Sequence, residues 1–373
     1  MKHQFKFTNG LYTLRFIAAV LIIIAHWGIY YKEKTPHFKL LLGIIPLHKV
    51  ALPFFWVLSG YIMSSLLFKM RLSMPENENK LPLIADFLVK RCIRLFPIYY
   101  ILFIVLYFIG FPGIADHPFY YITHSYNIFV YKTQVPNPLV HLWSLSAQEQ
   151  FYLILPFFIL YINEKYLKHI IYLAMAIGLG TRFYSSFILG NEFTTLFNHI
   201  LDSLGLGVLY GYYMYINKQQ KFERIIKFIV PLLLYVYVQF SDFRGTPLGI
   251  TYAQIMWSFV VLSIIIFTIN TSNKWMNKYL FENKVLNYFG HASYGIYLFH
   301  YPIGVLIDDY SKPYLKAHNL HHVLSIFILM YIIKLIIVLV VAAISYTYIE
   351  TPITNLARKI RFQKPKEFSP SLS

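Results

Sequence analysis

Apolar runs long enough to cross a membrane recur along the whole chain, and they restrict the fold more than any other feature of the sequence. A helix of about 20 apolar residues spans the hydrocarbon core of a bilayer, which is about 30 Å thick. The composition agrees, because only 13% of the 373 residues are charged, against roughly 25% in an ordinary soluble domain. The sequence therefore predicts an all-α fold, a polytopic transmembrane helical bundle in a cell membrane.

Ten spans are expected, and the basic residues give their orientation. Alternating the connections between spans places 23 of the 33 Lys and Arg residues on one side and eight on the other. Because cytoplasmic loops carry the excess of basic residues, both termini are predicted to be cytoplasmic. The expected spans are residues 13–31, 49–69, 92–112, 141–161, 168–189, 196–216, 226–241, 253–271, 289–308 and 323–349.

The composition also narrows the function classes. The net charge of +17 follows mostly from topology, so nucleic acid is not an expected partner. A single cysteine, Cys92, excludes an internal disulfide and a thiolate metal cluster, and the histidines show no ligand-like spacing on a helix. We expect no metal. The domain expectation is a membrane domain over residues 1–350 and a basic cytoplasmic tail over residues 351–373.

The first apolar segment carries two ionisable residues, Arg15 and His26. Eleven positions separate them, which in a helix is about three full turns, so both lie on one stripe about 16 Å apart along the axis. Ionisable residues within a membrane span usually face the protein interior and are functional. The plainer interpretation is that Arg15 is a snorkelling arginine and His26 a packed histidine.

Counting inward from the span ends places other polar residues in two layers. Arg91 and Arg94 come out at the cytoplasmic face, where forked guanidinium donors suit phosphates, although plain positive-inside charge explains either one alone. Ser59, Glu149 and His300 come out in the middle to outer layer, at the depth of His26. A carboxylate beside an imidazole suits general base catalysis.

Two further charges match each other in depth. Arg182 and Asp202 fall on adjacent antiparallel spans. We expect a structural ion pair, because an unpaired charge at that depth is expensive. Lys334 also lies within a span, and the sequence suggests no partner for it.

Six segments, in order, resemble motifs of the integral-membrane acyltransferase family three, the sugar and polysaccharide O-acetyltransferases. They are "RFIAAVLIIIAH", "LPFFWVLSGYIM", "RCIRLFPIYY", "HLWSLSAQEQFYLILP", "ASYGIYLFHYPI" and "YIETPI". Most are weak singly, but the six extend over about 340 residues. The resemblance is to a stand-alone form, without the appended esterase-like domain that some members carry.

The resemblance implies an acetyl transfer from acetyl-CoA to a glycan hydroxyl in a bacterial cytoplasmic membrane. Arg91 and Arg94 would hold the CoA phosphates, with Arg15 near the pore entrance. His26 would act as the base, with a covalent acetyl-imidazole as the alternative. The glycan would be lipopolysaccharide O-antigen, capsule or exopolysaccharide, or a lipid-linked precursor.

The chain departs from the family pattern at the expected glutamate, where Gln148 stands, while Glu149 follows one step later. One step turns a helix by about 100°, so either Glu149 or Gln148 orients His26, with Ser59 and Tyr152 as further candidates. The Arg that the family places ahead of Asp202 is also absent.

One rival function comes from another class of protein. A transporter or flippase of lipid-linked glycans would also have many spans and intramembrane charges. Arginines spaced for phosphates at the cytosolic edge, with a histidine in the outer half, favour the transferase. A proton relay in a transporter does not require phosphate-binding arginines.

Overall fold

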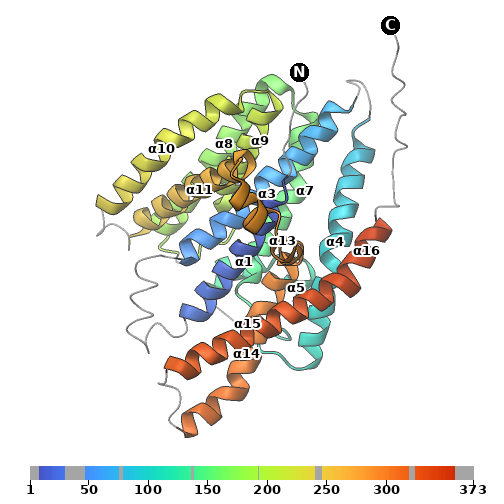
Figure 1. The fold of residues 1–373 in the computed structure, drawn as a ribbon, viewed down its shortest axis with the longest axis vertical. Helices are drawn as coiled ribbons and strands as arrows, with labels where there is room; N and C mark the ends of the chain where they lie inside the picture. The colour runs from blue at the N-terminus through green and yellow to red at the C-terminus, as the bar shows by residue number, and fades with distance from the viewer. Residues whose placement is uncertain are drawn as a thin grey trace.

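The computed structural model describes residues 8–29, 47–74, 79–135, 138–191, 193–239, 246–318 and 324–357, and within them the fold is all-helical (Figure 1). Short π or 3-10 turns adjoin several helices: η1 (Tyr184–Ile188), η2 (Phe197–Ile200), η4 (Asn277–Phe281) and η6 (Tyr346–Glu350). The α-helices are α1 (Gly10–Ile29), α3 (Leu47–Leu72), α4 (Leu81–Phe108), α5 (Pro118–Ile122), α6 (Tyr126–Thr133), α7 (Leu142–Tyr161), α8 (Glu164–Phe183), α9 (Leu201–Tyr215), α10 (Gln219–Gln239), α11 (Pro247–Asn270), α12 (Lys274–Met276), α13 (Lys284–His291), α14 (Ser293–Ala317), α15 (Leu324–Ser345) and α16 (Thr351–Ala357).

The chain is a multi-pass membrane protein. Six helical stretches within the described residues are long and apolar enough to cross a bilayer. They are Gly10–Trp27, Val50–Leu72, Leu81–Phe108, Glu164–Ile188, Leu248–Asn270 and Ile328–Ala357. Each of the ten expected spans overlaps a helix, but α7, α9, α10 and α14 do not meet that criterion. Ten spans and cytoplasmic termini stay predictions.

Helix α4 is longer than the sequence suggested. The third span was expected to begin at residue 92, whereas α4 begins at Leu81 and has a proline in its first turn. The added turns carry an ion pair of the i,i+4 type between Lys90 and Asp86, 2.6 Å apart, which suits a helix. The stretch is mostly apolar, but Asp86, Lys90 and Arg91 interrupt it, so the span expected from the sequence begins after these charges. Arg91 and Arg94 therefore lie well inside a helix instead of at its start.

Helices α3 and α9 cross with their backbones almost in contact. A Cβ atom at Gly60 would lie 2.1 Å from the carbonyl oxygen of Leu204, and one at Gly207 would lie 2.1 Å from the carbonyl oxygen of Val57. Small residues allow this close approach between helices in membranes, where van der Waals packing drives association. The crossing fixes the rotation of α3 about its axis and so the direction of Ser59, the neighbour of Gly60.

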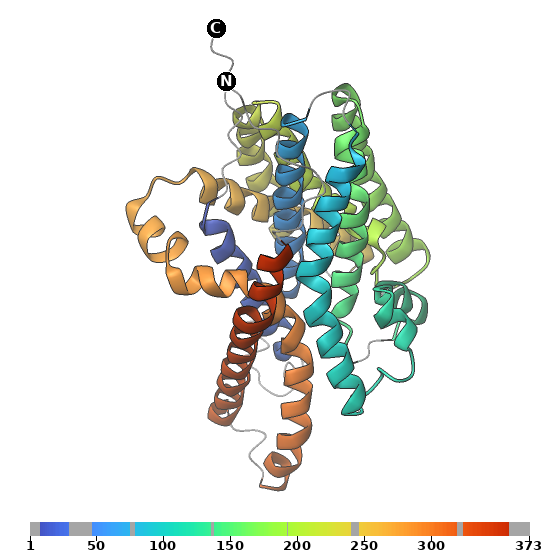
Figure 2. The same ribbon diagram turned by 90° about the vertical axis from the view of Figure 1, so that its right-hand side faces the viewer.

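Helices α14 and α15 form an antiparallel hairpin that extends away from the group of helices α8 to α11 (Figure 2). Lys334 on α15 donates to Asp308 on α14, so the charge without a sequence-suggested partner is paired here. Beyond α15 the helical run continues through η6 into α16. The expected boundary between membrane domain and tail at residue 350 therefore falls within a helical run, and residues 358–373 of the tail lie outside the described residues.

The segment after α4 folds back along that helix. The hydroxyl of Tyr99 donates to the carbonyl oxygen of Tyr121 (3.0 Å), and that of Tyr100 donates to the carbonyl oxygen of Ile122 (2.8 Å). These bonds bring the end of α5 level with the middle of α4. Non-helical backbone at membrane depth is tolerated where protein buries it, and this segment places His124 against α4 and α7.

Candidate functional site

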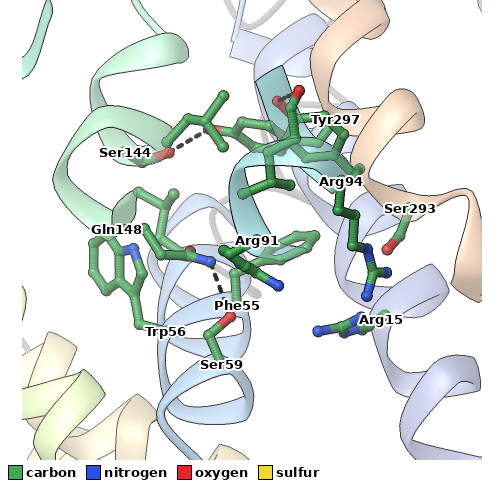
Figure 3. Close-up of a pocket in the computed structure, with 14 residues that line it drawn as sticks. Arg15, Phe55, Trp56, Ser59, Arg91, Arg94, Ser144, Gln148, Ser293 and Tyr297 are labelled. Carbon is green, nitrogen blue, oxygen red and sulfur yellow. Dashed lines mark hydrogen bonds between the residues drawn. The ribbon is translucent and has the colours of Figure 1, made fainter. Parts of the chain in front are cut away.

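A cavity with an empty volume of about 630 Å³ lies between α1, α3, α4, α7 and α14 (Figure 3). Its polar lining combines three arginines with hydroxyl and amide groups. Five helices that are far apart in sequence thus place their polar residues around one space. The lining residues are Arg15, Leu52, Phe55, Trp56, Ser59, Arg91, Arg94, Leu95, Ser144, Leu145, Gln148, Ser293, Tyr294 and Tyr297.

Three arginines share the cavity wall, which we call the arginine cluster: Arg15 from α1 and Arg91 and Arg94 from α4 (Figure 3). The charges of Arg94 and Arg91 are close enough to act on Arg15. Within the described ranges, no carboxylate lies within 4 Å of any of the three guanidinium groups. Glu350, which accepts a hydrogen bond from Ser345 (3.0 Å), is a carboxylate whose charge acts on Arg94. The cluster therefore presents excess positive charge to a water-accessible space.

Ser59 and Gln148 face the arginine cluster. The amide nitrogen of Gln148 donates to the hydroxyl of Ser59 over 3.0 Å and also contacts the hydroxyl of Tyr152. The guanidinium carbon of Arg91 lies 4.2 Å from the centre of the Tyr152 ring, a cation–π contact that holds this arginine against α7. The wall is thus preorganised by side-chain contacts between α3, α4 and α7.

Glu149 points away from this cavity. Its Oε2 lies 2.5 Å from Nδ1 of His124, and both side chains are buried. The two atoms are within 4 Å of each other without the angle of a regular hydrogen bond. His124 also stacks on Phe96 at 4.7 Å and packs on Tyr99 at 4.1 Å between ring centres. The structure therefore does not bring Glu149 together with His26.

His26 pairs with another histidine. Its Nδ1 lies 2.7 Å from Nε2 of His300, and Nδ1 of His300 lies 2.6 Å from the carbonyl oxygen of Tyr297. Tyr297 is the link to the cavity, because its ring lines the cavity one turn below His300 on α14. His26 itself is not among the lining residues. It lies beyond the cavity on the same stripe of α1 as Arg15, about 16 Å further along the axis.

Polar contacts fix the wall between the cavity and the histidine pair. The hydroxyl of Tyr297 donates to the carbonyl oxygen of His141 over 2.7 Å and lies 2.5 Å from the hydroxyl of Ser144. The ring of His141 lies 5.1 Å from that of His300, edge to face. The beginning of α7 and the middle of α14 are therefore tied together at this level.

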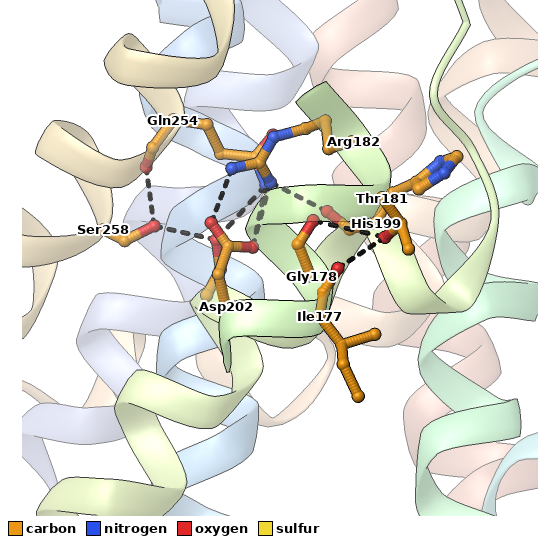
Figure 4. Close-up of polar contacts among 9 residues, drawn as sticks. Ile177, Gly178, Thr181, Arg182, His199, Asp202, Gln254 and Ser258 are labelled. Atoms are coloured by element: carbon orange, nitrogen blue, oxygen red, sulfur yellow. Dashed lines mark hydrogen bonds and ion pairs between the residues drawn. The ribbon is translucent and has the colours of Figure 1, made fainter. Parts of the chain in front are cut away.

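Arg182 on α8 is fully buried and has a different environment from the arginine cluster (Figure 4). Arg182 donates to both carboxylate oxygens of Asp202, over 2.9 and 2.6 Å, and to the carbonyl oxygen of His199 over 2.8 Å. The expected ion pair is confirmed, with both side chains buried. Its charge is neutralised within the fold, as the charge of Lys334 is by Asp308. Neither pair lines the cavity.

Comparison with known proteins identifies the family. A family model described as an acyltransferase domain matches residues 9–347. The chain belongs to this acyltransferase family. The match covers all five helices that carry cavity residues, so the acyltransferase domain contains the whole candidate site.

Curated relatives of this acyltransferase are bacterial. The chain is 28% identical over 344 residues to the O-acetyltransferase OatA of Staphylococcus aureus (strain MRSA252), covering 84% of this chain and 54% of that protein. It is 27% identical over 338 residues to the peptidoglycan O-acetyltransferase OatA of Listeria monocytogenes serovar 1/2a, covering 82% and 51%. The chain spans about half the length of the curated relatives it matches. No solved structure matches it.

Five of the fourteen residues that line the cavity of the acyltransferase were predicted from the sequence, whereas the predicted His26 and Glu149 do not line it. Arg15, Ser59, Arg91, Arg94 and Gln148 come together around one space. His124 was not singled out, because the aromatic external loop gives no periodic signal for its position, and His141 was not singled out although it begins the span expected at residues 141–161. The one available signal for His124 is its place between aromatic residues. Among the described residues, no group of three or more His, Cys, Asp and Glu side chains could hold a metal ion.

Proposed function

We propose that the protein is a membrane O-acetyltransferase that moves an acetyl group from cytosolic acetyl-CoA to a hydroxyl of a cell-surface or lipid-linked glycan. One observation carries the proposal: three arginines converge on a cavity, and no carboxylate of the described residues lies within 4 Å of their guanidinium groups. Unneutralised charge within a membrane domain is costly, so it suits a ligand that brings negative charge. The family and the printed names of the relatives support acetyl as the transferred group.

The donor binds with its nucleotide phosphates on the arginine cluster. Arg91 and Arg94 offer forked donors that match phosphate oxygens, and Arg15 adds a third charge from α1. From there the pantetheine arm runs past Tyr297 toward the histidine pair. The distance of about 16 Å between Arg15 and His26 along α1 separates phosphate binding from chemistry.

Transfer takes place at His26. Its neutral imidazole takes the proton of the glycan hydroxyl while the hydroxyl oxygen attacks the acetyl carbonyl carbon. The carbon–sulfur bond then breaks, and the sulfur leaves with its electron pair and takes up the proton from His26. General base catalysis of this kind typically contributes about 10²–10⁴-fold. Gln148 and Ser59, which face the cavity, position the donor below the reacting centre.

The acceptor is a glycan outside the cytoplasm. The name of the Listeria relative places peptidoglycan beside lipopolysaccharide, capsule and exopolysaccharide as acceptors to test. A lipid-linked precursor of any of these polymers presents the same chemistry, a sugar hydroxyl at the outer membrane face. The experiment therefore compares NMR spectra of all surface glycans from cells with and without the protein. O-acetyl signals that depend on the protein identify both the reaction and the polymer.

The His26→Ala variant tests the catalytic step. We expect O-acetylation to fall by about 10² or more, while immunoblotting finds normal levels in the membrane and purified protein still binds acetyl-CoA. Binding survives because the arginine cluster is untouched. Near-normal O-acetylation in this variant would remove His26 from the mechanism. Glycans that change in amount at the surface but carry no acetyl groups would favour a flippase.

A further inference from the structure

The hydrogen bonds around His300 define which nitrogen of His26 does chemistry. A backbone carbonyl oxygen can only accept, so the contact of 2.6 Å between Nδ1 of His300 and the oxygen of Tyr297 requires a proton on Nδ1. In a neutral imidazole the other nitrogen is then an acceptor. Nε2 of His300 therefore carries a lone pair, and it points at His26.

The same reasoning extends one step along the chain of bonds. Nδ1 of His26 lies 2.7 Å from that lone pair, so Nδ1 carries the proton of His26 and donates it. The two rings are inclined by only 12°, which suits a hydrogen bond in the plane of both imidazoles. In neutral His26 the remaining lone pair then belongs to Nε2.

We propose that His300 is a positioning residue, which holds His26 in the tautomer with the proton on Nδ1 and so makes Nε2 the catalytic base. The inference rests on the proposed function for its catalytic consequence. When Nε2 takes the proton of the glycan hydroxyl, His26 becomes an imidazolium. Its bond from Nδ1 to Nε2 of His300 then becomes a charge-assisted bond, which is stronger than a neutral one. His300 thus stabilises the charge that develops during transfer.

The surroundings hold His300 in place for this task. Its side chain is fully buried, at 0% exposure. The indole nitrogen of Trp27 donates to the backbone oxygen of His300 over 3.3 Å, which ties the two helices together next to the histidine pair. His141 packs against the ring edge to face. The role usually taken by a carboxylate beside a catalytic histidine falls here to an imidazole, because Glu149 pairs with His124.

Two substitutions separate positioning from packing. His300→Leu fills the site but offers no acceptor, whereas His300→Gln keeps an acceptor oxygen on a flexible side chain. We expect His300→Leu to lower kcat by about 10²-fold, within the range of general base effects, with KM for acetyl-CoA unchanged. His300→Gln should recover at least tenfold of that loss. A purely structural role predicts equal losses in both variants.

A matched control lies on the same helix. His318, near the end of α14, makes the same kind of contact, from Nδ1 to the carbonyl oxygen of Tyr314 over 2.9 Å, but its side chain is exposed. His318→Leu should leave kcat and KM at wild-type values. This variant separates the general effect of replacing a histidine on α14 from the effect at His300.

The tautomer of His26 can be measured without an activity assay. ¹⁵N NMR of histidine-labelled protein in bilayers should report a protonated Nδ1 for His26 in the wild type. In the His300→Leu variant the proton should shift toward Nε2. A wild-type His26 protonated on Nε2, or a kcat of His300→Leu within twofold of wild type, would overturn the inference. If His26→Ala keeps its activity while the NMR result holds, the catalytic role proposed for His26 fails and the histidine pairing stands.

Discussion

The arginines within the membrane domain of this acyltransferase show opposite solutions to the same physical problem. Arg182 is 1% exposed and is matched by the carboxylate of Asp202 and a backbone oxygen. Among the described residues, the arginine cluster has no carboxylate within 4 Å, and it lines a cavity instead. A fold that can neutralise one arginine in the membrane could neutralise the others. The difference therefore distinguishes the charge of Arg182, which holds two helices together, from the charges of the arginine cluster, which are available to a ligand.

The largest effect, on folding, is expected where the ion pair of Arg182 and Asp202 is broken. Arg182→Ala leaves the buried carboxylate of Asp202 without its charged partner and with only the long contact of 3.5 Å from the amide of Gln254, a change that costs about 3–5 kcal/mol of folding free energy. We expect little folded protein in the membrane, measured by immunoblot and by thermal unfolding of what can be purified. The double variant Arg182→Met with Asp202→Leu removes both charges and should recover most of the stability. A single variant as stable as the wild type would contradict the structural role.

An intermediate effect, on binding alone, is expected in the arginine cluster. Arg94→Ala removes a charged contact worth about 1.5–3 kcal/mol, so KM for acetyl-CoA should rise by roughly 10–100-fold with kcat little changed. The ligand-free protein should lose no stability, because a repulsive charge is removed from beside Arg15. Acetyl-CoA should also stabilise the variant less than the wild type against heating.

Arg91→Ala should behave in the same way as Arg94→Ala. Arg224→Ala, at an exposed position on α10 on the same predicted side of the membrane, serves as the matched control and should leave KM unchanged. A large loss of kcat at unchanged KM in the Arg91 or Arg94 variant would move that arginine from donor binding to the chemical step.

The smallest effect is expected at the two adjacent residues of α7 that face in different directions. Gln148→Ala removes the bond of 3.0 Å to Ser59 and should lower kcat by about fivefold, the equivalent of a hydrogen bond of about 1 kcal/mol. Glu149→Gln keeps a polar group against His124, away from the cavity, and should have a smaller effect on turnover. Assays of both purified variants decide the ranking. The reverse order would place Glu149 in the mechanism.

The sequence predicted the parts of this site that follow from helix periodicity and depth. Arg15 and His26 share a stripe by spacing alone, and the pairing of Arg182 with Asp202 follows from matching depths on neighbouring spans. The rotation of a helix about its axis is harder to predict from sequence. Gln148 and Glu149 point about 100° apart, and only packing against α3 and α4 decides which one faces the cavity. The sequence therefore left both candidates open.

Contacts between distant segments were beyond the reach of sequence reasoning. His124 meets Glu149 only because the segment after α4 folds back and is held by Tyr99 and Tyr100. No local pattern encodes that return. Lys334 finds Asp308 across the hairpin of α14 and α15, a partner that depends on the register of two helices. The number of spans and the side of each terminus stay predictions of hydropathy and charge.

The close crossing of α3 and α9 has a mechanical consequence for the cavity. With Gly60 and Gly207 in backbone contact, the two helices cannot slide or rotate without a steric clash, and 83% of the spanning stretch of α3 is buried. The wall of the cavity that bears Ser59 is therefore rigid. The spanning stretch of α4 is only 22% buried within the fold, so the side of the cavity that bears Arg91 and Arg94 is held by fewer contacts with other helices than the side that bears Ser59.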